Sequence, residues 1–269
     1  MPSAPRKILC QNLPFGAIME EADRSPRQTL LLHQEVHMWR NASAETTEQA
    51  PPYQAERRAM VEHQIRRRGI RDEKVLEAML TVPRHEFVPA PYIGAAYDDR
   101  PLPIGETETI SQPYIVAAMT AAAQIRPGDK ALEIGTGTGY QAAILAHLGA
   151  KVYTLERNFL LAEAARTRLA RLGFQGIEVI WGDGTEGHAA AAPYQVILVT
   201  AAAPRVPQPL LDQLADGGRM VIPVGDLFHQ ELQLVFKHGD QLATRFLDPC
   251  QFVPLIGRYA WPEKKEQFQ

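Results

Sequence analysis

The sequence predicts an α/β protein built around a doubly wound, Rossmann-like sheet with mostly parallel strands. Apolar strands alternate with helical segments between residues 127 and 225, a pattern typical of parallel sheets. A glycine-rich turn at 135–139 joins the first of these strands to a helix, so backbone amides face any ligand at the end of the strand. A turn signal at 238–241 between two apolar runs predicts an added antiparallel hairpin.

Composition narrows the class of protein. The 269 residues are 45% hydrophobic and 22% charged, which is the balance of an ordinary soluble protein. A formal net charge of −3 leaves no overall basic field, so nucleic acid is not an expected partner. Apolar runs stay far below the roughly 20 residues that span a bilayer, and the N-terminus lacks a signal-peptide core. Cys10 and Cys250 match no metal or redox spacing. We therefore expect a cytoplasmic monomer without membrane partners.

Residues 1–54 are expected to form a partly irregular extension ahead of one large domain at 55–269. Six prolines interrupt the extension, and 41–50 is polar and rich in small residues. A short helix is predicted over 28–40. It carries His33 and His37, but the glutamate between them does not occupy the place that zinc motifs require, so no metal site is expected.

Helices should open the large domain. One is predicted over 56–68 and ends at Gly69, with three arginines where cations suit the helix dipole. A second, over 72–80, has Asp72 as its N-cap. Its expected buried residues are Val75, Leu76, Met79 and Leu80. Pro83 should stop this helix, and 84–89 should continue as an extended link.

A loop-rich stretch at 97–105 leads to Ser111. On spacing alone, Ser111 is predicted to cap a helix over 113–123, with Pro113 in the first turn. Strands and helices then alternate through the core. The predicted strands are 131–134, 151–155, 177–181, 194–199 and 219–222, the helices are 140–148, 159–172 and 209–214, and the hairpin strands are 232–236 and 242–247.

The glycine spacing indicates the kind of ligand. A dinucleotide fingerprint is G-x-G-x-x-G, whereas this turn reads G-x-G-x-G and has Tyr140 where the third glycine would stand. Glu133, two residues before Gly135, would also repel a pyrophosphate. A nucleoside with a cationic aminoacyl end and no phosphate fits better. Glycines that merely close a strand–helix turn remain the simpler alternative.

Three acids follow successive strands: Glu133, Glu156 and Asp183. Because parallel strands end at one edge of a sheet, we expect all three in one crevice. Glu156 lies about twenty residues beyond Gly135, the spacing at which an acid accepts ribose hydroxyls. Asp183, between two glycines, could accept from an exocyclic amine such as that of adenine. A nicotinamide cofactor would explain only Glu156.

The chain resembles the protein-L-isoaspartate O-methyltransferase family over about three quarters of its length. The blocks that carry the resemblance are 60–89, 109–114 (TISQPY), 132–148, 182–184, 199–203 (VTAAA), 223–225 and 252–255 (FVPL). The TISQP and FVPL blocks are particular to that family, whereas the glycine turn is shared by many methyltransferases. The resemblance implies S-adenosylmethionine as cofactor, S-adenosylhomocysteine as product, and isoaspartyl proteins and peptides as substrates. It divides the domain into a helical and substrate part (55–126), a cofactor core (127–225) and a hairpin with a substrate-cleft segment (226–269).

The resemblance also implies site residues. Ser111 matches the serine beside the point of methyl transfer, and Val253 lies in the segment that holds substrate through its backbone. The implied cofactor residues are Thr109, Ile110, Glu133, Gly135, Thr136, Gly137, Gly139, Glu156, Arg157, Asp183, Gly184 and Gln230. An isoaspartyl α-carboxylate, with a reference pKa of about 3.3–3.7, is ionised at neutral pH and needs no general base. Ser111 is thus expected to orient the carboxylate.

Three alternatives remain open at this point. The first is a methyltransferase of the same fold that acts on another carboxylate or small molecule. The second is a non-catalytic adaptor that retains the domain for recognition. The third is a nicotinamide-dependent oxidoreductase, which the glycine spacing disfavours.

Overall fold

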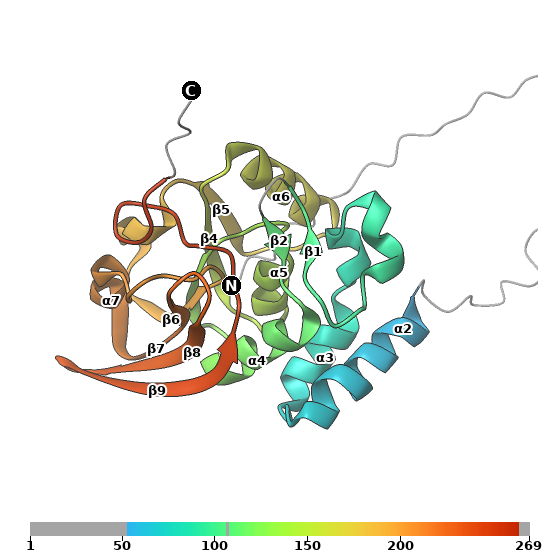
Figure 1. Cartoon of the computed structure of the whole chain (residues 1–269), viewed down its shortest axis with the longest axis horizontal. Helices are drawn as coiled ribbons and strands as arrows, with labels where there is room; N and C mark the ends of the chain where they lie inside the picture. Colours follow the sequence, from blue (N-terminus) through green and yellow to red (C-terminus); the bar gives the residue numbers. More distant parts are fainter. Residues whose placement is uncertain (1–52, 106–107, 264–269) are drawn as a thin grey trace, which may run out of the picture. The chain divides into compact units, whose positions relative to one another are not determined.

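The computed structural model describes residues 53–105 and 108–263. The predictions for residues 1–52, including the helix over 28–40 and the pair His33 and His37, lie outside these residues. A seven-stranded sheet forms the centre of the described part, in the order β5-β4-β3-β6-β7-β8-β9 (Figure 1). The strands are β3 (Lys130–Ile134), β4 (Lys151–Glu156), β5 (Ile177–Trp181), β6 (Tyr194–Val199), β7 (Leu214–Gly225), β8 (Gln230–His238) and β9 (Gln241–Cys250).

The strand directions confirm the predicted mixed sheet. Strands β3 to β7 pair in parallel, while β8 and β9 are each antiparallel to the preceding strand. β3 lies between β4 and β6, so the order of winding reverses at its carboxyl end, where doubly wound sheets bind ligands. β7 begins before the predicted strand 219–222 and ends after it, and its pairing with β6 shifts register between Tyr194 and Val196.

Helices cover both faces of the sheet. α4 (Pro113–Ala123) and α5 (Tyr140–His147) pack on one face through Met119 and Leu145, together with Val152 of β4. α6 (Phe159–Arg171) contacts β4 and β5. α7 (Gln208–Gln213) packs Leu210 on the opposite face, against Leu132 of β3. Side chains alternate along a strand, so Glu133, the neighbour of Leu132, is turned toward α4 and α5.

The helical segment before the sheet differs from the sequence prediction in detail. α2 (Gln54–Ala59) continues into a π-helical segment, Met60–Ile65, and a 3-10 turn, Arg66–Arg68, instead of one α-helix. α3 (Glu73–Thr81) begins as predicted, because the Asp72 carboxylate accepts from the amides of Lys74 and Val75. The predicted burial of Leu80 is wrong, since it is 37% exposed.

Two segments before α4 differ from the sequence prediction. Residues 84–89 do not continue as the predicted extended link, because they begin with a 3-10 turn, Arg84–Phe87, closed by a hydrogen bond from the Glu86 amide to the Pro83 carbonyl. The predicted loop-rich stretch at 97–105 contains the short strand β1 (Leu102–Pro103), which pairs with β2 (Thr109–Ile110). No helix in the described ranges is long and apolar enough to cross a membrane.

Candidate functional site

The glycine turn after β3 takes a backbone conformation that other residues rarely adopt. Gly135, Gly137 and Gly139 have φ angles of 94°, 53° and 90°. A Cβ atom on Gly135 would stand 2.4 Å from the Thr200 Oγ1 atom. The amides of Gly135 and Thr136 both donate to the Leu155 carbonyl, at 2.8 and 3.2 Å. The turn therefore lies close over the ends of β4 and β6, and its outer side is bare backbone.

Glu156, at the end of β4, holds the turn in place. One carboxylate oxygen accepts from the Gly137 amide and the other from the Asn158 amide, each at 2.9 Å. Burial raises the pKa of this carboxyl group, and the two amide hydrogen bonds oppose the shift. Each oxygen has a second lone pair, so Glu156 can still accept from a ligand hydroxyl.

Glu133 is buried beside the same turn. Its Oε2 atom accepts from the Thr154 hydroxyl at 2.5 Å, and the Thr136 hydroxyl lies 2.6 Å from that of Thr154. The Oε1 atom is buried and has no hydrogen-bond partner among the residues that the structure describes. Burial, reinforced by the charge of Glu156, raises the pKa of Glu133 to about 8. An unpaired buried oxygen is costly unless a ligand donates to it, so this atom suits a cationic group.

Two connected cavities contain most of the predicted cofactor residues. The larger, of about 380 Å³, is lined by Thr109, Gly135, Gly137, Glu156, Arg157 and Gly184. The smaller, of about 40 Å³, is lined by Thr109, Ile110, Glu133, Gly135, Thr136 and Gly137. Gly139 lines neither of them and begins α5, with its Cα side against Leu169. The structure thus brings together residues from β2, β3, β4 and the turn after β5.

Asp183 lies apart from the other two acids. It lines a neighbouring cavity of about 610 Å³, which shares Arg157 with the larger cofactor cavity. Its Oδ1 accepts from the amide and hydroxyl of Thr185, and its Oδ2 accepts from the Arg258 amide at 2.8 Å. The expected single crevice is therefore a row of adjoining cavities, and Asp183 also ties the C-terminal segment to the sheet.

The prediction that Ser111 caps α4 is wrong. Gln112 is the N-cap residue and makes no side-chain capping bond, while the Asp99 carboxylate accepts from the Tyr114 amide at 3.3 Å. The Ser111 hydroxyl forms no hydrogen bond within 53–105 and 108–263. Because the Asp99 carboxylate accepts from an amide at the start of α4, the half-buried hydroxyl of Ser111 stays available to a ligand.

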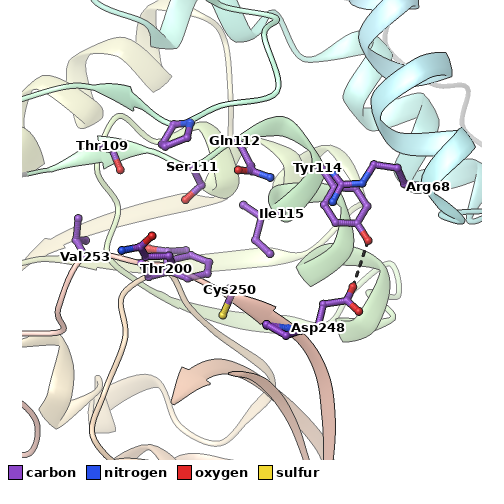
Figure 2. A pocket seen from close by; sticks show the side chains of 14 residues that line it. Arg68, Thr109, Ser111, Gln112, Tyr114, Ile115, Thr200, Asp248, Cys250 and Val253 are labelled. Atoms are coloured by element: carbon purple, nitrogen blue, oxygen red, sulfur yellow. Dashed lines mark hydrogen bonds between the residues drawn. The ribbon is translucent and has the colours of Figure 1, made fainter. Parts of the chain in front are cut away.

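Ser111 lines a further cavity, of about 440 Å³, together with Thr200 and Val253 (Figure 2). Figure 2 also shows its far side, where the Tyr114 hydroxyl donates to Asp248 at 3.2 Å. This cavity and the larger cofactor cavity have Thr109, Thr200 and Val253 in common. Ser111 itself lines both the first cavity and the smaller cofactor cavity, so a ligand in the first would meet a ligand in the cofactor cavities beside Ser111. We call the first the serine cavity.

The two C-terminal predictions have different outcomes. Val253 lies between both cavities, and its carbonyl is held by the Ala202 amide at 2.8 Å. Gln230 lines none of the four cavities described above, and its cofactor contact stays a prediction. Instead, its side-chain amide binds the backbone of Phe252, accepting from the amide at 2.7 Å and donating to the carbonyl at 3.3 Å. Gln230 thereby positions the Val253 segment.

Thr200 is a site residue that sequence reasoning did not select. It follows β6 directly and donates from its hydroxyl to the carbonyls of Ile134 and Gly135, at 2.9 and 2.8 Å. It lines the serine cavity and both cofactor cavities. The rule that singled out the three acids, a polar residue at the end of a parallel strand, would also have found it. In the described part of the chain, no group of three or more His, Cys, Asp or Glu side chains could hold a metal ion.

Comparison with known proteins decides the family. The model of the family "Protein-L-isoaspartate(D-aspartate) O-methyltransferase" matches residues 55–260. A protein-L-isoaspartate O-methyltransferase of Methanoculleus marisnigri is 56% identical over 213 residues, which are 79% of this chain and 97% of that protein. One from Koribacter versatilis is 57% identical over 206 residues, covering 77% and 93%. The chain belongs to the protein-L-isoaspartate O-methyltransferase family.

Solved structures support the same family assignment. A protein-L-isoaspartate O-methyltransferase matches with a TM-score of 0.69 at 29% identity, covering 76% of this chain and 67% of that one. A proposed family member from Plasmodium falciparum, solved in complex with S-adenosylhomocysteine, matches with a TM-score of 0.65 at 25% identity, covering 74% and 97%. The predicted family and methyltransferase class are thereby confirmed, and the S-adenosylhomocysteine of the Plasmodium falciparum structure is the product form of the predicted cofactor.

The cavities of this family member fit that cofactor. The bare glycine backbone admits a ligand closely, the orphaned Oε1 of Glu133 suits a cationic amino group, and Glu156 retains acceptor capacity for hydroxyls. These features match a nucleoside that carries an amino-acid end.

Proposed function

We propose that this chain transfers a methyl group from S-adenosylmethionine to the free α-carboxylate of L-isoaspartyl residues in damaged proteins and peptides. The observation that carries the proposal is the junction at Thr109, Thr200 and Val253, where the serine cavity meets the cofactor cavity. The available hydroxyl of Ser111 lines the serine cavity near this junction. Membership of the family supports the substrate class.

The chain's own residues hold the cofactor in this proposal. The backbone of Gly135 and Gly137 would lie against its amino-acid part, and Glu133 would accept from the cationic amino group. Glu156 would accept from the ribose hydroxyls. When bound, S-adenosylmethionine supplies an electrophilic methyl group on a positively charged sulfur. The remaining predicted contacts, with Ile110, Thr136, Arg157, Asp183 and Gly184, belong to the same proposal.

Ser111 orients the substrate. The isoaspartyl α-carboxylate is already ionised at neutral pH, so no residue has to remove a proton from it. The Ser111 hydroxyl donates a hydrogen bond to one carboxylate oxygen and leaves the other free to face the methyl group. The Val253 amide, which makes no hydrogen bond in the described part of the chain, can donate to the substrate backbone. Catalysis then rests on proximity, alignment and exclusion of water. The backbone amide nitrogen of the isoaspartyl linkage attacks the methyl ester and expels methanol, which gives a succinimide. Water then opens this ring, in part to normal aspartate.

Methyl incorporation from labelled S-adenosylmethionine into two synthetic peptides tests the proposal. The peptides differ only in an isoaspartyl or a normal aspartyl linkage. Base-labile label on the isoaspartyl peptide alone is the expected result. Label on neither peptide, with cofactor binding intact, would favour another carboxylate substrate or an adaptor without activity.

The proposed substrates are isoaspartyl proteins and peptides, with no nucleic-acid or membrane partner. The net charge of −3 supports the absence of a nucleic-acid partner. The cytoplasmic location and the monomeric state stay predictions. Light scattering coupled to size-exclusion chromatography measures the second.

A further inference from the structure

Arg84 is buried without a carboxylate partner. Its side chain is fully shielded from solvent, and no ion pair with Asp or Glu forms within the described ranges. The guanidinium lies over the Tyr140 ring, with 4.9 Å between its carbon and the ring centroid, and its Nη1 atom has no hydrogen-bond partner. Removing a charge from water without an opposite charge is costly, so the contacts that Arg84 does make need a reason.

Those contacts are two backbone carbonyls. Nε donates to Ala96 at 2.8 Å, and Nη2 donates to Ser111 at 2.7 Å. The two carbonyls belong to the residues just before Tyr97 and just after Ile110, so one planar guanidinium joins the chain on either side of the paired strands β1 and β2. A lysine ammonium lacks the fixed fork that reaches two carbonyls in this geometry.

Described residues between the two carbonyls line one side of the site. Thr109 lines the serine cavity and both cofactor cavities, and Ile104 lines the larger cofactor cavity. The Ile104 Cδ1 atom lies 3.2 Å from the position of a Cβ atom on Gly137. Ser111 itself follows β2 directly. A shift of the Ser111 carbonyl would therefore move its hydroxyl relative to the junction of the cavities.

We propose that Arg84 is a positioning residue for methyl transfer: by binding the Ala96 and Ser111 carbonyls, it fixes the Ser111 backbone so that the hydroxyl meets the substrate carboxylate. The inference rests on the proposed function, because it acts through the role of Ser111 there. Arg84 lines none of the described cavities.

The chain offers a matched control in Arg219. This arginine is also buried, at 6% exposed, and donates to the carbonyls of Ala123 and Gln124 at 2.7 and 3.3 Å. It adds an ion pair with Asp129 at 3.0 Å. These contacts lie at the C-terminal end of α4, whereas Arg84 acts next to the N-terminal end of that helix. Arg219→Lys therefore removes a comparable buried guanidinium that lies away from Ser111.

A double-mutant cycle tests the inference. We would measure kcat and KM for the isoaspartyl peptide in Arg84→Lys and Arg219→Lys, each with Ser111 present and with Ser111→Ala. Arg84→Lys should lower kcat at least tenfold when Ser111 is present and less than threefold in the Ser111→Ala background. Arg219→Lys should change kcat less than threefold in both. S-adenosylhomocysteine affinity should change less than threefold in all four variants.

Each other outcome overturns the inference. An equal loss from Arg84→Lys in both backgrounds would show that the arginine does not act through Ser111. If Arg84→Lys unfolds, Arg84→Gln replaces it in the cycle; unfolding of both while Arg219→Lys stays folded would assign Arg84 to the fold alone. Absence of methylation by the unchanged protein would refute both the proposed function and the inference. An active protein in which the effects of Arg84→Lys and Ser111→Ala on kcat are additive would refute the inference only.

Discussion

Replacing Ser111 by alanine separates a role in the site from a role at the helix end. A hydrogen bond to a charged group contributes about 1.5–3 kcal/mol. If the hydroxyl binds the substrate carboxylate in the transition state, its loss should lower turnover about 10- to 150-fold. The hydroxyl makes no hydrogen bond within the described residues, so S-adenosylhomocysteine affinity should stay within about threefold of the unchanged protein.

The same variant makes a prediction about stability. Loss of a true N-cap would cost about 1 kcal/mol and lower the Tm by roughly 2–4 °C in a domain of this size. The structure shows no such cap at Ser111, so the free energy of unfolding should change by less than about 0.5 kcal/mol. The Asp99 carboxylate accepts from the Tyr114 amide and pairs with Arg68 at 2.7 Å. Loss of Asp99 should therefore weaken the N-terminal end of α4.

The assay compares Ser111→Ala with Asp99→Ala. Thermal unfolding gives the Tm of each, isothermal titration gives the affinity for S-adenosylhomocysteine, and label incorporation into the isoaspartyl peptide gives turnover. Asp99→Ala should lose Tm, which shows that the measurement detects a lost cap. Unchanged turnover in Ser111→Ala, or a Tm loss as large as that of Asp99→Ala, would refute the reasoning.

Two further variants test the glycine turn and its buried acid. Gly135→Ala puts a Cβ atom at a φ of 94° and 2.4 Å from the Thr200 hydroxyl. The resulting strain of roughly 1–3 kcal/mol should lower the Tm by several degrees and weaken S-adenosylhomocysteine binding. Calorimetry measures the Tm and titration the affinity, and unchanged values would contradict the role of the glycine turn. Burial raises the pKa of Glu133 from 4.5 to about 8 in the folded state. The folded state thus binds this proton more tightly than the unfolded state. The contribution of Glu133 to stability is fully present below the unfolded pKa and is lost as the pH rises through about 8. Between pH 4.5 and 8.5 this loss is on the order of 4 kcal/mol in the free energy of unfolding, and Glu133→Gln should remove it. Urea unfolding at the two pH values measures the loss in each protein. An equal pH dependence in both proteins would exclude Glu133 as its source.

Local patterns determined most of the fold. The strands at 177–181 and 194–199, the N-cap at Asp72 and the turn at 238–241 lie where the sequence places them. Each depends on side-chain alternation, continuous apolar character or turn chemistry over a few neighbouring residues, and these act before distant segments meet. The site acids Glu133 and Glu156 followed from the same logic, because a parallel sheet brings the ends of its strands to one edge.

Contacts between distant segments decided the rest. Asp99, rather than the adjacent Ser111, accepts a hydrogen bond from the first turn of α4. Gln230 binds Phe252 instead of lining a cavity, and Arg84 reaches Ser111 across 27 positions of sequence. Side-chain length and residue type permit many partners, and only the packed chain selects among them. The sequence alone therefore determined the sheet, the glycine turn and the class of ligand. The tertiary structure decided which polar groups are used internally and which, like the Ser111 hydroxyl, remain free for a ligand, because hydrogen-bond capacity is allotted only when the elements pack together.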